Sequence, residues 1–369
     1  MSLSVNMSTN TNTNTNKDRI RVLVVDDSAL MRKLIPQMLA TDDSIEVVGT
    51  AMDGTFCLKK IEELHPHVVT LDLEMPGMNG IDTLKEIMRH RPVPVIVFSS
   101  HSVEGASVTL KALGLGAFDF VTKPKDAAAH LAETTRELTS KVKVAAECRL
   151  KPRTLPGMRT TVEKTAPAAA PPTKIVALGI STGGPQALEY VLPQLPGDFA
   201  GSILVVQHMP ENFTGMFAKR LDELSALRVK EAQSGDLIQA GRVLICPGSR
   251  HMRVRRLPTG DVAVLSDDAR VNGHRPSADV LLRSVAESYK QQAVGVLMTG
   301  MGDDGAEGLK AVKAAGGLTI AQSEDSCVVY GMPKAAIERG YAQRIVALDA
   351  MANTLHSVCG RHETVRAGH

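Results

Sequence analysis

Short apolar runs alternate with segments of helical periodicity along most of the chain. In the N-terminal third, the apolar runs that predict strands lie at residues 19–28, 46–51, 67–72, 93–100 and 117–123. Helix-period segments separate them, and this alternation is typical of a parallel sheet with helices on both faces. We therefore predict a doubly wound α/β domain over this part of the chain.

A second alternation starts near residue 174. Its predicted strands are residues 174–180, 202–208, 242–248 and 293–300, and its predicted helices are residues 186–195, 277–290 and 308–316. Two shorter runs, at residues 251–257 and 261–266, are joined by the turn sequence "PTG" and predict an inserted antiparallel hairpin. The predicted fold class is α/β, with two doubly wound parallel-sheet domains in series.

The segments outside these alternations have little apolar surface to bury. The N-terminal segment contains "TNTNTNTN", which is typical of a disordered tail, and the segment between the domains is rich in Pro, Ala and Thr, as in a semi-rigid linker. The predicted organisation is a tail at 1–18, a first domain at 19–132, a linker at 133–172, a second domain at 173–358 and a tail at 359–369. The first part of this linker has a charged helical pattern.

Composition narrows the possible function classes. The 369 residues carry a net charge of +2 and no Trp, which argues against strong attraction to nucleic acid and against base stacking. Five scattered cysteines indicate free thiols in a reducing compartment. The chain has no apolar run of the roughly 18–20 residues that a membrane span needs and no apolar secretory signal. We expect a cytoplasmic monomer that does not insert into a membrane.

Charged residues stand at the predicted strand ends of the first domain. Asp26 and Asp27 follow the first strand, Asp72 ends the third and Lys123 ends the fifth. Ligands of a parallel sheet gather at the carboxyl ends of its strands, so three carboxylates are expected to meet there and to need a divalent cation. Mg²⁺ suits carboxylate oxygens best, and a carboxylate can accept a phosphoryl group. The alternative for Asp27 is a helix cap, since "DDSALMRKL" also looks like a helix start.

Together with "LDLEMPGMNG", a serine after the fourth strand and "TKP", these positions resemble a response-regulator receiver domain. The resemblance implies a flavodoxin-like fold, with a sensor histidine kinase as the phosphodonor. It also implies that Asp72 is the phosphoacceptor and that Asp26, Asp27 and Asp72 hold Mg²⁺. By the same resemblance, Ser99 is the switch hydroxyl and Lys123 binds the phosphate.

Three polar residues follow separate predicted strands of the second domain. Ser181 stands in "GISTGG", which fits the G-x-S-x-G pattern of a nucleophile elbow, although glycine-rich turns also cradle phosphates. His208 ends the next strand and Asp304 follows "AVGVLMTG"; a structural histidine and a helix cap are their alternatives. Because these strand ends share one sheet edge, a serine, a base and an orienting acid can meet there.

Several motifs of the second half resemble the chemotaxis protein-glutamate methylesterase (CheB) family, in which a receiver is fused to a serine esterase. The motifs are "GISTGGP", "QHMP", "PGSRHM", "HRPSADVL", "LMTGMGDDGAEGL" and "DSCVVYGMP". The resemblance implies a Rossmann-like second domain with Ser181 as nucleophile, His208 as general base and Asp304 as orienting acid. It further implies that Met301 donates a backbone N–H to the oxyanion hole and that Thr182 lines the cleft.

The implied reaction is hydrolysis of glutamyl methyl esters on chemoreceptors, with deamidation of particular glutamines by the same route and no metal in the hydrolysis. Phosphorylation of Asp72 is expected to loosen a receiver that covers the Ser181 cleft. Asp303 stands where an Asn is expected in many relatives, and this extra carboxylate can raise the pKa of one of the two aspartates, Asp303 or Asp304, or that of His208.

Two other functions are compatible with parts of the sequence. The basic run at residues 249–257 suggests a DNA-binding output domain, but it alternates like a surface strand and no helix-turn-helix pattern accompanies it. A catalytically silent adaptor that binds receptors is the second alternative. Methanol release that is lost on substitution of Ser181 distinguishes an enzyme from an adaptor.

Overall fold

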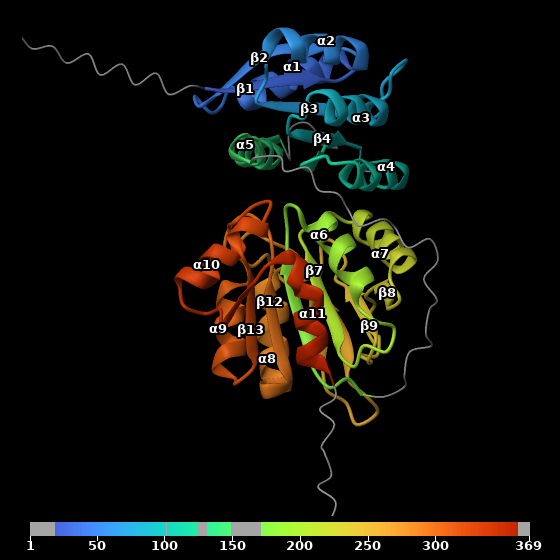
Figure 1. Ribbon diagram of the computed structural model, residues 1–369, viewed down its shortest axis with the longest axis vertical. Coiled ribbons are helices and arrows are strands. Elements are labelled where there is room, and N and C mark those ends of the chain that lie inside the picture. Colours follow the sequence, from blue (N-terminus) through green and yellow to red (C-terminus); the bar gives the residue numbers. More distant parts are fainter. Residues whose placement is uncertain (1–18, 101, 124–130, 149–170, 361–369) are drawn as a thin grey trace, which may run out of the picture.

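The computed structural model describes residues 19–100, 102–123, 131–148 and 171–360, which form two α/β units stacked along the long axis of the molecule (Figure 1). Each unit contains one parallel sheet, and the second unit adds a two-stranded antiparallel sheet. The predicted fold class is thus confirmed. None of the helices in these residues combines the length and apolar character that crossing a bilayer requires.

The first unit has a five-stranded parallel sheet in the order β2-β1-β3-β4-β5. Its strands are β1 (Ile20–Val25), β2 (Ile45–Ala51), β3 (Val68–Asp72), β4 (Val95–Ser99) and β5 (Asp119–Thr122). Its helices are α1 (Ala29–Leu39), α2 (Gly54–Leu64), α3 (Gly80–His90), α4 (Val103–Gly114) and α5 (Leu131–Glu147). All five strands predicted for this half of the chain are present.

Helices α1 to α4 each begin at a short polar side chain that accepts the N–H of the third residue after it. These caps are Ser28, Asp53, Asn79 and Ser102. The cap of α1 is therefore Ser28, and the helix-cap alternative for Asp27 is wrong. Because Ser28 caps the helix, the Asp27 carboxylate is not needed as a cap and is available at the carboxyl edge of the sheet.

Helix α5 packs against the first sheet. Its residues Leu138, Val142 and Ala145 are fully buried in one cluster with Val22 of β1 and Phe98 of β4. Their spacing of three and four residues puts them on one face of the helix. The first unit consequently extends through α5, past residue 132, where the sequence analysis placed its boundary. The N-terminal tail and most of the linker and C-terminal tail lie outside the described residues.

The second unit has a seven-stranded parallel sheet in the order β14-β13-β12-β6-β7-β9-β8. Its strands are β6 (Ile175–Ile180), β7 (Ser202–Gln207), β8 (Arg228–Glu231), β9 (Arg242–Ile245), β12 (Ala293–Leu297), β13 (Leu318–Gln322) and β14 (Arg344–Val346). Its helices are α6 (Gly184–Val191), α7 (Phe213–Leu224), α8 (Ala278–Tyr289), α9 (Ala306–Ala314), α10 (Met332–Glu338) and α11 (Leu348–Cys359), with short 3-10 helices at Leu192–Gln194, Lys290–Gln292 and Glu324–Ser326. The chain runs from β6 toward β7 on one side and from β12 toward β13 on the other. The adjacent strands β6 and β12 thus form the topological switch point at which ligands bind in such sheets.

The predicted hairpin is confirmed, because β10 (His251–Arg255) pairs antiparallel with β11 (Val262–Ser266). Strands β8, β13 and β14 and helices α7, α10 and α11 were not predicted. Strands β8 and β14 lie at the two edges of the large sheet, where burial on both faces is not required. Their sequences, "RVKE" and "RIV", consequently lack the long apolar runs that marked the central strands.

The first unit lies against the carboxyl edge of the second sheet. The Phe120 ring of β5 stacks on Phe213 at the start of α7, with 4.7 Å between ring centroids and 11° between planes. Gln186 of α6 donates from Nε2 to the carbonyls of Leu113 (3.2 Å) and Ala117 (3.0 Å). The first unit therefore covers the edge of the second sheet at which a ligand is expected.

Candidate active site and phosphoacceptor site

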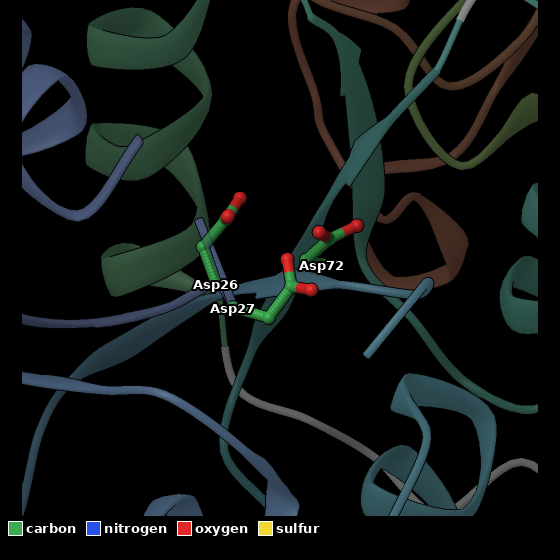
Figure 2. A group of neighbouring side chains, drawn as sticks. All are labelled: Asp26, Asp27 and Asp72. Carbon is green, nitrogen blue, oxygen red and sulfur yellow. The ribbon is translucent and has the colours of Figure 1, made fainter. Parts of the chain in front are cut away.

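Three carboxylates meet at the carboxyl edge of the first sheet, as the sequence predicted. Figure 2 shows Asp26 and Asp27, which directly follow β1, beside Asp72 at the end of β3. One oxygen atom from each of the three lies within 4.8 Å of the others. Asp26 and Asp72 are buried and Asp27 is exposed, so the group opens to solvent on one side.

Lys123 offsets part of this negative charge. Its Nζ donates to Asp72 Oδ2 at 2.7 Å and lies 3.2 Å from Asp26 Oδ2. Burial raises the pKa of Asp26. Burial disfavours the charged amine of Lys123, but Asp72 and then Asp26 outweigh it and raise the pKa of the lysine. Asp26 Oδ2 is buried without a hydrogen bond among the described residues, so this oxygen and its neighbours fit a hard cation such as Mg²⁺.

The Ser99 hydroxyl at the end of β4 is bonded away from the acidic group. It accepts from Thr109 Oγ1 at 2.5 Å and donates to the Ser100 carbonyl at 3.2 Å. Both partners belong to α4 or the turn before it, and none of its hydrogen bonds reaches Asp72. A switch role for Ser99 therefore requires its hydroxyl to change partners.

Ser181 follows β6 at the turn into α6. Gly183 has φ +77°, in the left-handed region that favours glycine, and a side chain at Gly184 would meet Gln207 Oε1 at 2.0 Å. The Ser181 N–H donates to Thr299 O at 3.0 Å, and its carbonyl accepts from Gly184 N at 2.8 Å. The glycines thus make the turn tight, and this turn holds a half-buried serine at the switch point.

His208, directly after β7, is bonded to Asp304 in the loop between β12 and α9. Its Nε2 lies 2.8 Å from Asp304 Oδ2. Asp304 also accepts from Ser277 Oγ (2.7 Å), Ala278 N (2.7 Å) and Asp279 N (3.2 Å) at the start of α8. Burial alone would raise the pKa of this carboxyl, but His208, Ser277 and the Ala278 N–H lower it to about 2. Asp304 thus interacts with the N-terminus of α8 and stays ionised, and the predicted alternative of a cap on α9 is wrong.

Ser181 and His208 line a common cleft of about 620 Å³. His208 Nδ1 is buried and has no hydrogen-bond partner among the described residues, and no hydrogen bond joins the Ser181 hydroxyl to this ring. Such bonds are often long or misaligned before substrate binds. The structure therefore shows His208 bonded to Asp304 and lining the same cleft as Ser181. The hydrogen bond that a serine hydrolase needs between the Ser181 hydroxyl and the His208 ring is not formed.

Asp303, next to Asp304, points to a different partner. Its Oδ2 lies 2.6 Å from Arg339 Nη2 at the end of α10, and its side chain is half exposed. The pKa of Asp304 is lowered rather than raised. Asp303 is paired with an arginine, and the main groups that set the pKa of Asp304 do not include it.

Thr182 and Met301 line the cleft together with Ser181. In the part of the chain that the structure describes, the Met301 backbone N–H donates no hydrogen bond, which suits an oxyanion donor. The buried hydroxyl of Thr182 donates to Asp119 Oδ2 of β5 at 2.7 Å. A residue of the first unit is thus bonded to the position next to Ser181.

His274 is a neighbour of the site that the sequence analysis did not identify. Its ring stacks on that of His208, with 4.0 Å between centroids and 4° between planes. Burial and then the nearby His208 lower the pKa of His274 to about 4, so it is neutral at physiological pH. The motif "HRPSADVL" contains this residue, but no strand end marked it as part of the site.

Comparisons with known proteins agree with this arrangement. A family model described as CheB methylesterase matches residues 176–355, and one described as response regulator receiver domain matches residues 22–135. A protein-glutamate methylesterase/protein-glutamine glutaminase of Koribacter versatilis is 60% identical over 346 residues, covering 90% of this chain and 94% of the relative. One from Symbiobacterium thermophilum is 45% identical over 359 residues, covering 92% and 97%.

Among solved structures, the CheB methylesterase catalytic domain of Thermotoga maritima is 42% identical and covers 50% of this chain and 98% of that chain, with a TM-score of 0.49. The family resemblance inferred from the sequence motifs is confirmed by the curated relatives and the family models. The chain belongs to the CheB family of protein-glutamate methylesterases/protein-glutamine glutaminases that carry a response regulator receiver domain.

Proposed function

We propose that Ser181 is the nucleophile of this esterase, His208 its general base and Asp304 the acid that orients the imidazole. The observation that carries the proposal is the 2.8 Å hydrogen bond between His208 and Asp304 in the cleft that Ser181 lines. A carboxyl with a pKa of about 2 is ionised at neutral pH and stabilises the imidazolium that forms when His208 takes a proton.

The proposed reaction is acyl transfer in two halves. Ser181 Oγ attacks the ester carbonyl while His208 takes its proton, and the Met301 N–H stabilises the oxyanion. The C–O bond to the leaving group then breaks, and His208 returns the proton so that methanol leaves. Water attacks the acyl-enzyme with His208 again as base, which regenerates Ser181 and releases a carboxylate. A glutamine amide follows the same route and releases ammonia.

The proposed substrates are glutamyl methyl esters, and particular glutamines, on methyl-accepting chemoreceptors in the cytoplasm. The curated relatives carry both activities in their name. Hydrolysis would reset receptor modification during adaptation in chemotaxis. The protein is proposed to act as a monomer.

Asp72 is the proposed phosphoacceptor, with a chemotaxis histidine kinase as phosphodonor. Asp26, Asp27 and Asp72 would hold Mg²⁺, which when bound offsets charge on the transferring phosphoryl group. Lys123 already donates to Asp72 at 2.7 Å and would pair with the new phosphate. Ser99 would exchange Thr109 for a phosphate oxygen.

Phosphorylation is proposed to uncover the cleft. Receiver residues line it together with Ser181, and Asp119 holds the Thr182 hydroxyl. Added negative charge at Asp72 biases the receiver toward a state that no longer fits this contact. A large receptor then gains access to the nucleophile.

The test is methanol release from methylated receptors by the full chain, with and without a small-molecule phosphodonor and Mg²⁺. We expect Ser181→Ala to abolish release under both conditions. Asp72→Asn should keep a basal rate that the phosphodonor does not change. Release that persists in Ser181→Ala would exclude this nucleophile, and receptor binding without release by the wild type would indicate an adaptor.

A further inference from the structure

Helix α5 of the receiver presents acidic side chains to the proposed active-site cleft. Glu133 and Glu137 line the cleft together with Ser181. They are four residues apart, so they lie on one face of the helix. Glu137 is neutralised within its own helix by Lys141, at 2.8 Å. A receiver helix therefore contributes two carboxylates to the cleft that Ser181 lines.

The partner of Glu133 belongs to the other domain. Its Oε1 lies 3.2 Å from Arg270 Nη1, and among the described residues this is its ion pair. Arg270 lines the same cleft and donates to Gly273 O at 3.1 Å, which fixes the loop that carries His274. An arginine of the methylesterase domain thus binds a carboxylate on a helix that covers the cleft.

A second arginine strengthens the positive charge of this wall. Arg275 also lines the cleft, and its Nη1 donates to the carbonyls of Asp267 (2.9 Å) and Asp268 (3.2 Å). These bonds fix the guanidinium, whose Nε is buried without a hydrogen-bond partner among the described residues. The wall therefore contains one arginine engaged with a carboxylate and a second whose guanidinium is held by two backbone carbonyls.

The Glu133–Arg270 ion pair is exposed and therefore weak, which limits the role that it can have. The two side chains are 53% and 55% exposed, and pairs of this kind contribute only about 0–1 kcal/mol. The domain contact depends instead on the Phe120–Phe213 stack and on Gln186. The pair is thus too weak to hold the domains together, but it is easily exchanged for an equivalent carboxylate on another helix.

We propose that Arg270 is a specificity-determining residue that binds a carboxylate one helical turn from the scissile ester of an acidic helical substrate, and that Glu133 occupies this place while the receiver covers the cleft. The inference rests on the proposed hydrolase function. Ser181 and Arg270 line the same cleft, so a helix with its ester at Ser181 can present to Arg270 a carboxylate four residues away on the same helix face. Arg275 adds charge to the same wall.

The experiment uses the full chain with a small-molecule phosphodonor and Mg²⁺, and three helical peptides that each carry one glutamyl methyl ester. The residues four positions before and after the ester are Glu in the first peptide, Gln in the second and Lys in the third. We expect the wild type to show a KM about 5-fold lower for the Glu peptide than for the Gln peptide, with equal kcat. Arg270→Ala should give equal KM values for the Glu and Gln peptides, and Arg270→Lys should keep part of the difference. Arg270→Glu should prefer the Lys peptide.

The matched control is Arg256→Ala. It removes the same charge from an arginine that lies over Tyr289, 5.5 Å from the ring centroid, and does not line the cleft, so the KM ratio should stay at the wild-type value. Without phosphodonor, Glu133→Gln should raise the basal rate slightly, by at most about 5-fold. If Arg270→Ala shows the same KM ratio between the Gln and Glu peptides as the wild type, the inference is overturned and the proposed hydrolase function is not affected. Absence of methanol release from all peptides overturns the proposed hydrolase and the inference with it.

Discussion

Two buried aspartates of this protein lie after strands of its parallel sheets and have different surroundings. Asp26 in the receiver and Asp304 in the methylesterase domain both follow a central strand of a parallel sheet, and they are 0% and 1% exposed. Burial raises the pKa of Asp26, and nearby Asp72 acts in the same direction against Lys123. The pKa of Asp304 is about 2, because its hydrogen bonds outweigh the effect of burial.

The difference lies in the partners and not in the depth of burial. Asp304 accepts from one imidazole, one hydroxyl and two backbone N–H groups, so its charge is satisfied and its orientation is fixed. Asp26 shares its site with two other carboxylates, and among the described residues its Oδ2 has only the ion-pair contact with Lys123 Nζ at 3.2 Å. At the carboxyl edge of one sheet donors converge on a carboxylate, which suits the proposed orienting acid, and at that of the other sheet carboxylates converge, which suits the proposed cation site.

Asp304→Asn should have the largest effect. The amide cannot stabilise the imidazolium and favours the wrong tautomer of His208, so kcat for methyl-ester hydrolysis should fall by about 10⁴. Mg²⁺ binding to the receiver should not change. Stopped-time assays of methanol release, with Mg²⁺ titration of the same sample, measure both quantities.

The matched control for this variant is Asp279→Asn. Asp279 is a second buried carboxylate at the start of α8, and it accepts from Gly308 N at 2.6 Å without touching His208. It should leave kcat within a few-fold of the wild type, because its side chain bonds Asn272 and Gly308 and neither His208 nor Asp304. Equal losses of kcat in the two variants would contradict the role assigned to Asp304.

The central strands of both sheets could be predicted because they are buried on both faces and need continuous apolar runs. Strand β14, "RIV", has two exposed residues and is three residues long, so no run of this kind exists to be found. Helix α5 was recognised as a helical pattern but assigned to the linker. It belongs to the receiver because Leu138 and Val142 pack against the sheet. The local sequence predicts the helix but does not predict this tertiary contact.

The same division applies to the proposed site. Ser181, His208 and Asp304 were proposed together because each follows a strand of one sheet, and the topology of a parallel sheet brings such ends to one edge. His274 lies in a loop far from any strand end, and only the folded loop stacks it on His208. Asp119 comes from the other domain, so its bond to Thr182 depends on how the domains pack.

Ser277→Ala removes one of the hydrogen-bond donors to Asp304, and its expected effect is smaller than that of Asp304→Asn. It removes the 2.7 Å hydrogen bond to Asp304 Oδ1, which should loosen the carboxylate and lower kcat about 10-fold. The lowered pKa of Asp304 stabilises the fold at pH values above its unfolded pKa of 3.8, and this contribution is lost as pH falls toward 2. The variant should raise this pKa, so its deficit in unfolding free energy should be larger at pH 7 than at pH 3.

Ser284→Ala is the control for that measurement. Ser284 lies on the same helix and accepts from Val254 N at 2.9 Å, far from the chemistry of His208. Its loss should lower the free energy of unfolding by a similar amount without a 10-fold loss of kcat. If both variants lose kcat equally, the hydrogen bond to Asp304 is not what matters.

Asp26→Asn tests the other side of the comparison and should have the smallest effect. A carboxyl whose pKa is raised by folding destabilises the fold increasingly as pH rises above its unfolded pKa of 3.8, so the charged Asp26 carries a cost at pH 7. In EDTA the variant should therefore be more stable than the wild type by about 1 kcal/mol, seen as a rise of about 2–4 °C in the receiver transition by calorimetry. Mg²⁺ should stabilise the wild type more than the variant, because the variant offers the cation one carboxylate fewer.

Asp53→Asn, which removes the same charge from the cap of α2 and keeps the capping oxygen, should change neither quantity. A variant that is less stable than the wild type in EDTA would mean that Lys123 already satisfies Asp26, and that the difference between the two aspartates is smaller than their partners indicate.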